Sequence, residues 1–429
     1  MIYHGNSQKH LIIMKFQQEM TGNPAINRIN KYLPIVGLYF FFNVIWLPEG
    51  LLYTTFLTPV FIVWLYDQKI TKPISWFFFI TILYGCIHVL TGVNYTIYLR
   101  SWLLFFSVFI FVLTFYQFTK ICHSLRDIFR TILITNFLLL LVALIFFFLP
   151  PLKGVFWMTS DVSTGLSEFS RLKMFTYEAS YYSLLLVPLA VYYLLKMIFF
   201  NFPNQGLVLL MVGLPLVLSF AFGVLLGIPL AIVVLFLSDI RLFYLKPHFR
   251  KALLIGLLLF IFFTILFIRI YPDNPLFLRL ANIFQGRDSS FRGRVFESLY
   301  LAYEVTKEKS LLFGAGLGQF KLLAKDLVAT FYSFTTEVET VRLSNTLSET
   351  LVTFGFSGLF IRFAVEIYLF FKTKVFNNYY RLVLFIFIFI YQFTGSYLMN
   401  IAEYVIWVLA FSKVFPEFDK VNVHEKKVS

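Results

Sequence analysis

The sequence is poor in charged residues and in cysteine. Only 14% of its 429 residues are charged and 59% are hydrophobic, whereas a soluble domain carries about a quarter charged residues. These values exclude a soluble globular enzyme, because most of the chain needs an apolar solvent. The two cysteines, Cys86 and Cys122, have the spacing of neither a disulfide framework nor a metal site.

Familiar catalytic motifs are also absent from the sequence. It has no zinc motif, P-loop or serine triad, and no DxD-type pair of carboxylates for a nucleotide sugar and its metal. Gly314, Gly316 and Gly318 are not a dinucleotide fingerprint, because no strand precedes them. We therefore expect no metal and no cofactor. The first 30 residues contain no apolar core with a cleavage site, so we expect no cleavable signal peptide, and Met14 and Met20 are alternative starts.

Long apolar runs dominate the chain. A membrane-spanning helix needs about 20 apolar residues, and the sequence predicts an all-α polytopic membrane protein with about twelve transmembrane helices. The predicted spans are 32–48, 50–66, 74–91, 99–119, 131–149, 177–199, 206–220, 221–238, 252–270, 346–371, 381–395 and 398–415. Gly and Pro residues interrupt the uncharged run 206–238, which we interpret as two short helices meeting near Ser219–Gly223.

The basic residues predict the orientation of these spans. With the N-terminus inside, the inner segments carry 21 basic residues and the short outer loops carry 4. This bias follows the positive-inside rule, which also explains the net charge of +14 without nucleic acid as a partner. We expect a bacterial inner-membrane protein with both termini in the cytoplasm. The long outer loop is the exception, with 10 basic residues between Arg269 and Arg342.

The predicted organisation has five parts. They are a cytoplasmic N-terminal segment (1–31), nine spans (32–270), a long periplasmic loop (271–345), three spans (346–415) and a cytoplasmic tail (416–429). Within the loop, residues 290–309 have the periodicity of an amphipathic helix. A glycine turn follows at 314–318, then a second short helix at 319–332. We expect these elements to form a small cap on the outer mouth of the bundle.

A cluster of arginines in this loop is the strongest chemical signal. Paired guanidinium donors bind phosphate groups, and a helix start provides free N–H groups that also favour anions. We therefore predict a pyrophosphate site, although a solvated basic loop or attraction to anionic lipid headgroups explains the same residues. The cluster consists of Arg279, Arg287, Arg292 and Arg294, with Arg171, Lys173 and Arg342 in neighbouring outer segments.

Glu178 marks the outer end of the sixth predicted span. A carboxylate there can act as a general base for a sugar hydroxyl, with its pKa raised by burial. A structural explanation is equally good, with Thr176 capping the helix and Glu178 in its first turn. Tyr177 and Tyr181, which flank this carboxylate, are candidates for substrate binding.

A third polar group opens the tenth predicted span. Thr346 and Glu349 have the spacing of a capping box, which favours a structural role for Glu349, whereas Asn345 can hydrogen-bond a ligand. Further along, Arg362 and Glu366 share one helix face. We favour a structural ion pair, since a lone Arg at mid-bilayer costs about 3 kcal/mol, with a buried functional charge as the alternative.

The order of four motifs resembles the O-antigen polymerase and ligase group of bacterial membrane glycosyltransferases, in particular Wzy-type polymerases. Residues 175–181 resemble an "EPSY"-like helix opening, with Ala179 in place of proline. Residues 218–223 resemble an "LSxSxG" turn, with Ala221 in place of the second serine. Residues 312–318 resemble a "GxGxG" segment, and residues 345–358 resemble an "N…L…GxxG" helix.

This resemblance implies a GT-C-like fold and a role in surface polysaccharide (lipopolysaccharide or capsule) biosynthesis. It implies an oligosaccharide repeat unit on undecaprenyl pyrophosphate as substrate, and transfer at the periplasmic face without a nucleotide sugar or cofactor. Outer-loop arginines would hold the pyrophosphate, Glu178 would deprotonate the acceptor with Glu349 in reserve, and a chain-length regulator is an expected partner.

Ser344 stands where ligases have a histidine, which favours a polymerase over a ligase. The Arg-x10-Gly spacing of some polymerases is absent from the outer loops. A flippase or transporter is the rival of a different class, but such proteins show two similar halves, and this chain is asymmetric.

Overall fold

The computed structural model describes residues 34–40, 42–44, 46–48, 51–121, 125–160, 169–200, 202–239, 282, 285, 293–332 and 341–425. Most of these residues are helical. Five helices are long and apolar enough to cross a membrane, namely α5 (Lys72–Leu90), α6 (Tyr95–Ile121), α7 (Arg126–Phe147), α9 (Ala179–Phe199) and α19 (Thr346–Lys372). Shorter apolar helices are α10 (Gln205–Ser219), α11 (Phe222–Ser238), α20 (Tyr379–Tyr391) and α21 (Ile401–Phe411). These helices are compatible with a helical membrane protein, and the count of twelve spans stays a prediction.

Some predicted spans differ from the helices observed. The span predicted at 50–66 is two pieces, α3 (Tyr53–Phe56) and α4 (Thr58–Asp67). Pro59 stands at the start of α4, where a proline's missing N–H is tolerated, and it could not continue a helix from α3. α20 and α21 have 13 and 11 residues, so at about 1.5 Å per residue each is shorter than a bilayer core of about 30 Å. The span predicted at 252–270 lies outside the described residues.

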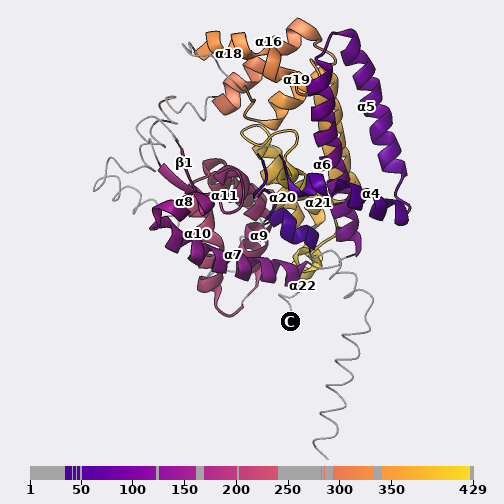
Figure 1. Cartoon of the computed structure of the whole chain (residues 1–429). Helices are drawn as coiled ribbons and strands as arrows, with labels where there is room; N and C mark the ends of the chain where they lie inside the picture. The colour runs from indigo at the N-terminus through magenta and orange to yellow at the C-terminus, as the bar shows by residue number, and fades with distance from the viewer. Residues whose placement is uncertain are drawn as a thin grey trace, which may run out of the picture.

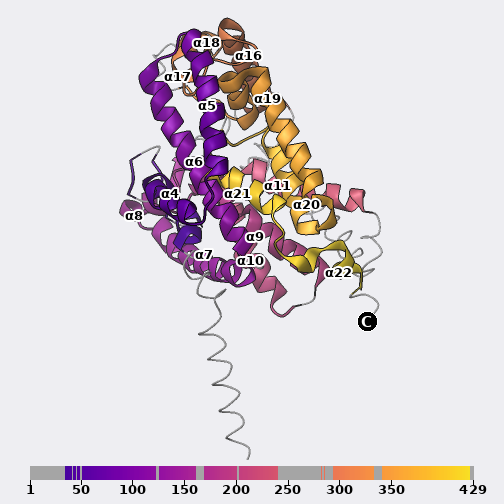
Figure 2. The same cartoon turned by 90° about the vertical axis from the view of Figure 1, so that its right-hand side faces the viewer.

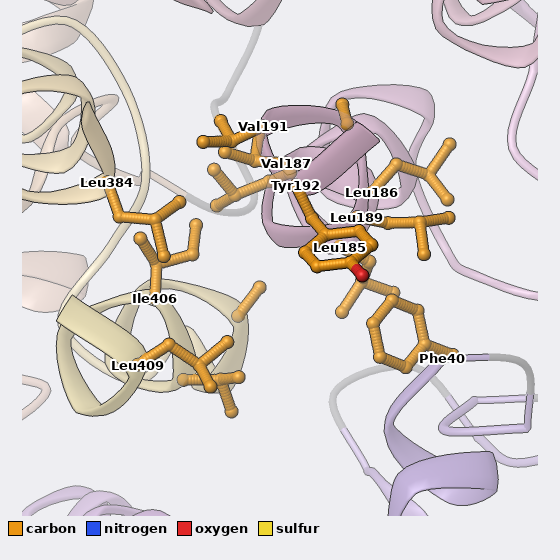
Figure 3. Packing of buried hydrophobic residues seen from close by; sticks show 14 of the residues in the cluster. Phe40, Leu185, Leu186, Val187, Leu189, Val191, Tyr192, Leu384, Ile406 and Leu409 are labelled. Carbon is orange, nitrogen blue, oxygen red and sulfur yellow. The ribbon is translucent and has the colours of Figure 1, made fainter. Parts of the chain in front are cut away.

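Helix α9 lies at the centre of the bundle. Leu185, Val187 and Val191 have no exposed surface, and α9 packs against α10, α11, α20 and α21. Figure 3 shows its side chains between Leu384 and Leu409 on one side and Phe40 on the other. An apolar residue is therefore favourable on almost every face of α9, which explains its continuous hydrophobic sequence.

The uncharged run 206–238 forms two helices, as predicted. α10 ends at Ser219 and α11 begins at Phe222, and Phe220 between them adopts a left-handed conformation with φ of 51°. α11 approaches α20 closely, because Gly223 and Gly227 present no side chain to that neighbour. A Cβ on Gly227 would lie 2.8 Å from Cε2 of Phe387. Small residues four apart allow this close helix packing.

A short hairpin, which the sequence did not predict, precedes α9. α8 (Pro150–Phe156) leads into β1 (Trp157–Ser160), which pairs antiparallel with β2 (Phe169–Leu172). The indole N–H of Trp157 donates to the carbonyl of Ala143 in α7 (2.7 Å). The hairpin thus fixes the segment that enters α9.

Helices form within the two predicted stretches 290–309 and 319–332, and we call this group the cap. It consists of the π-helix η1 (Gly293–Glu297), α16 (Ser298–Lys309), α17 (Phe320–Leu323) and α18 (Lys325–Tyr332). The amphipathic face of α16 buries Leu301, Ala302 and Val305, and α16 packs on α19. Figures 1 and 2 place α16 and α18 at one end of the molecule and α22 (Lys420–Glu425) toward the opposite end.

The glycine turn joins α16 to α17 and inserts against a kink in α19. Gly314, Gly316 and Gly318 all have positive φ, and so does Gly355 inside α19. A Cβ on Gly314 would lie 2.6 Å from the backbone N of Gly355. Only glycine fits at these backbone positions, so the turn and the kink depend on each other.

We predict that Gly227→Ala destabilises the protein whereas Gly213→Ala does not. The new methyl group at 227 would collide with the buried ring of Phe387, and overpacking of this kind costs about 1–3 kcal/mol. Gly213 in α10 has no atom within 4 Å of an added Cβ, so alanine there should be neutral or stabilising by up to about 1 kcal/mol. Thermal unfolding of both variants in detergent measures the difference, and equal melting temperatures would contradict the close packing of α11 on α20.

Candidate functional site

A cavity of about 490 Å³ lies where several helix ends meet. Its walls come from α6, the start of α9, the start of α19, the cap and the loop between α20 and α21. Apolar residues line much of it. The polar residues are Ser107, Tyr177, Glu178, Ser180, Tyr181, Arg294, Lys321, Arg342, Ser344, Glu349, Thr353, Tyr391, Ser396, Tyr397 and Asn400, with Thr55 from α3.

This cavity brings together five site residues predicted from sequence. Glu178, Glu349, Arg294, Tyr177 and Tyr181 all line it. They come from three segments that are far apart in the chain. The sequence placed all of them at the outer face, and the fold gives them one common space.

Glu178 is the residue immediately before α9. Its backbone is extended, with φ −144° and ψ 142°, so it occupies the N-cap position and not the first turn. Its carboxylate makes no capping hydrogen bond and accepts one from the hydroxyl of Ser180. The predicted capping role of Thr176 is wrong, because its hydroxyl donates to the carbonyls of Lys173 (2.6 Å) and Glu178 (2.9 Å). The carboxylate of Glu178 is thus directed to the cavity.

Glu349 lies in the first turn of α19, opposite the loop before α21. Its Oε2 accepts a hydrogen bond from the backbone N–H of Leu398. The predicted capping box is wrong by one residue. Asn345 caps the helix, its Oδ1 accepting from the N–H of Ser348 (2.7 Å) and its Nδ2 donating to the carbonyl of Arg294. Asn345 thus links the start of α19 to η1 and does not line the cavity. The hydroxyl of Thr346 donates instead to the carboxylate of Glu403 (2.6 Å).

Three cationic side chains line the cavity. They are Arg294 from η1, Lys321 from α17 and Arg342, and none of them forms an ion pair with another residue in the described part of the chain. Partial burial, and then the positive charge of Arg342, lowers the pKa of Lys321 from its ordinary value of 10.5. Repulsion between these cations favours a bound anion. Lys321 was missed in the sequence, because an isolated lysine on a short helix resembles a solvated one.

Arg171, another of the predicted arginines, does not line this cavity. Arg171 is buried in β2, where it pairs in register with Met158, and its Nε donates to the carbonyl of Ser219 (3.0 Å). This bond ties the hairpin to the end of α10, so Arg171 has a structural position away from the cavity lining. Arg279, Arg287 and Arg292 lie outside the described residues.

Tyrosine side chains form one wall of the cavity. Tyr177 and Tyr181 are stacked with ring centroids 4.9 Å apart, and the hydroxyls of Tyr177 and Tyr397 are hydrogen-bonded. Burial raises the pKa of both Tyr177 and Tyr397, so both hydroxyls stay protonated. One of them donates to the other, which leaves one O–H that can donate to a ligand. Tyr397 and Asn400 were not predicted. The signal available for them was the polar interruption between the last two apolar runs.

Titration of Lys321 should control anion binding. Its lowered pKa means that it loses its proton, and its attraction for an anion, at a lower pH than an ordinary lysine. We predict that the stabilisation of the purified protein by sulfate, which keeps its charge throughout, declines as the pH rises toward 10.5. Lys321→Arg should retain the stabilisation, because arginine stays protonated. Lys321→Met should weaken sulfate binding about tenfold even at neutral pH.

Sulfate-dependent melting temperatures measured across this pH range provide the test. Lys325→Arg is the matched control, because Lys325 lies nearby on α18 and does not line the cavity. Identical pH profiles for wild type and Lys321→Arg would show that Lys321 does not bind the anion.

Comparison with known proteins adds no assignment to this geometry. No protein-family model, no curated protein and no solved structure matches the chain. Among the described residues, no group of three or more His, Cys, Asp or Glu side chains could hold a metal ion. The function of the cavity must therefore be argued from its own residues.

Proposed function

We propose that the protein is a membrane glycosyltransferase that polymerises oligosaccharide repeat units carried on undecaprenyl pyrophosphate. The single observation that carries the proposal is the composition of the cavity, in which two carboxylates, Glu178 and Glu349, face three cations without ion-pair partners among the described residues. A general base and an anion site are the two groups that transfer from a lipid pyrophosphate requires. The product would be a surface polysaccharide such as O-antigen or capsule.

The proposed reaction exchanges one bond at the anomeric carbon. A hydroxyl oxygen of the acceptor sugar attacks this carbon, and the bond from the carbon to the pyrophosphate oxygen breaks. The electron pair leaves with the lipid pyrophosphate, and the hydroxyl proton passes to a carboxylate. Each step needs a protein group at a definite place.

Arg294, Lys321 and Arg342 would bind the pyrophosphate. Its negative charge increases as the bond breaks, so fixed positive charges stabilise the transition state more than the ground state. A guanidinium can bind two phosphate oxygens at once. This role replaces the divalent metal that nucleotide-sugar enzymes use.

Glu178 would be the general base and Glu349 its alternative. Both carboxylates line the cavity, and Glu178 lies beside the stacked rings of Tyr177 and Tyr181. Aromatic faces bind the apolar faces of sugar rings, and the tyrosine hydroxyls can hydrogen-bond sugar hydroxyls. The acceptor would then lie on these tyrosines with one hydroxyl next to Glu178.

We predict that Glu178→Gln reduces polymerisation at least about 100-fold, the usual contribution of a general base. Glutamine keeps the size and hydrogen bonding of the side chain but cannot take a proton. The assay is the length of polysaccharide formed from lipid-linked repeat units by purified protein. Glu308→Gln, on the exposed side of α16, is the control and should give normal chains.

If Glu178→Gln also gives normal chains while Glu349→Gln does not, the base is Glu349. Normal chains in both variants would refute a carboxylate base.

We also predict that Arg294→Met lowers the rate by about 100-fold or more, the scale expected for loss of one charge stabiliser in the transition state. Arg130→Met on the exposed surface of α7 is the matched control. Products should stop at single repeat units while folded protein persists. A full ladder of chain lengths from Arg294→Met would contradict the proposed pyrophosphate site.

A further inference from the structure

A second hollow adjoins the cavity on the side of α6. It is an open groove of about 550 Å³, lined mainly by aliphatic and aromatic side chains. Leu99 and Leu103 line it from α6, and both are more than half exposed. Arg100 is its one charged residue. An apolar groove on a membrane-spanning helix is in reach of lipid chains.

The groove and the cavity are neighbours and share part of their lining. Leu51, Thr55 and Leu104 line both of them. Along α6, Leu99 and Leu103 line the groove and Ser107 lines the cavity, and residues four apart lie on one helix face. A single stripe of α6 therefore leads from the groove to the charged cavity.

The positions of the positive charges suit a ligand with one anionic end and one apolar end. Arg100 forms no ion pair with any residue in the described ranges, and its positive charge contributes to the lowered pKa of Lys321, after burial and Arg342. The cations of the groove and the cavity thus act on one another. A ligand that satisfies both spaces has an anionic headgroup at the cavity end and a hydrocarbon chain at the other.

We propose that this groove holds the hydrocarbon chain of a polyprenyl lipid while its pyrophosphate lies in the cavity. The proposal rests on the proposed function for the identity of the headgroup. Leu99 and Leu103 would contact the chain, and Thr55 and Leu104 would mark the passage between the two spaces. Specificity for a lipid carrier, and not for a soluble sugar phosphate, would then come from the α3–α6 side of the molecule.

Binding of three probes to the purified full-length protein tests this proposal. The probes are undecaprenyl pyrophosphate, undecaprenol without phosphate, and inorganic pyrophosphate. Leu103→Trp fills the groove and should weaken binding of undecaprenyl pyrophosphate about tenfold or more, since displacement of only two methylene groups has that effect. Binding of inorganic pyrophosphate should not change. The matched control is Leu138→Trp on α7, where the leucine is similarly exposed (57% against 53%).

Two results with these probes would overturn the groove assignment. One is wild-type affinity of Leu103→Trp for undecaprenyl pyrophosphate, and the other is equal affinity of the unchanged protein for inorganic pyrophosphate and undecaprenyl pyrophosphate. A lipid probe with a photoreactive group in the part of the chain next to the pyrophosphate, bound to unchanged protein, should label α6 between Tyr95 and Leu104, and labelling elsewhere alone would also refute the assignment. This measurement does not depend on the folding of a variant.

The two proposals can fail separately. If Leu103→Trp loses the lipid but Glu178→Gln and Glu349→Gln polymerise normally, the groove stands and the glycosyltransferase mechanism falls. If Leu103→Trp binds the lipid normally while Glu178→Gln and Arg294→Met make no polymer, the mechanism stands and the groove falls.

Discussion

Arg362, within α19, pairs with two carboxylates in the protein interior. It contacts Glu403 at the start of α21 and lies 3.0 Å from Oε1 of Glu366. Gln392, after the end of α20, accepts from Arg362 (2.8 Å) and donates to Glu366 (3.1 Å). Glu403 is fully buried and also accepts from Thr346. Removal of Arg362 would leave both carboxylates without their cation, and an uncompensated buried charge costs about 3–5 kcal/mol. The ion pairs and hydrogen bonds of this cluster fix the start of α19 and the adjacent ends of α20 and α21 relative to one another.

The cavity depends on that arrangement. With Thr346 anchored, Glu349 one turn later faces the loop before α21 and accepts from Leu398. The glycine turn of the cap is held by α5 and α19. His88 Nε2 in α5 lies 2.8 Å from the carbonyl oxygen of Phe313, and the N–H of Ala315 donates to the carbonyl of Val352 in α19 (2.7 Å). Charge pairing and the glycine turn together place carboxylates and cations in the same space. Neither fixed point contributes a side chain to the proposed chemistry.

Local signals in the sequence predicted much of this structure. Apolar length indicated the long helices, Gly and Pro indicated the break between α10 and α11, and periodicity indicated α16. The pairing of Arg362 with Glu366 followed from their spacing and is confirmed. The participation of Glu403 was missed, because a contact across 41 residues leaves no trace in a single sequence. For the same reason, the sequence placed Glu178 and Glu349 at one face but could not place them in one cavity, and it did not distinguish Arg294 from Arg171.

Tertiary contacts also decide which polar residues remain available for a ligand. Arg171, Asn345 and Thr346 looked as suitable as their neighbours in sequence, yet each is engaged in holding backbone or a buried carboxylate. Arg294, Lys321 and Arg342 are left facing two carboxylates, an arrangement with an excess of positive charge in a partly desolvated space. Such an excess is unfavourable when the cavity holds only water, because the effective dielectric constant there is lower than in bulk solvent. An anion relieves the repulsion among the cations, and the uncovered apolar groove beside them is the reason why we propose a lipid-bound anion and not a free one.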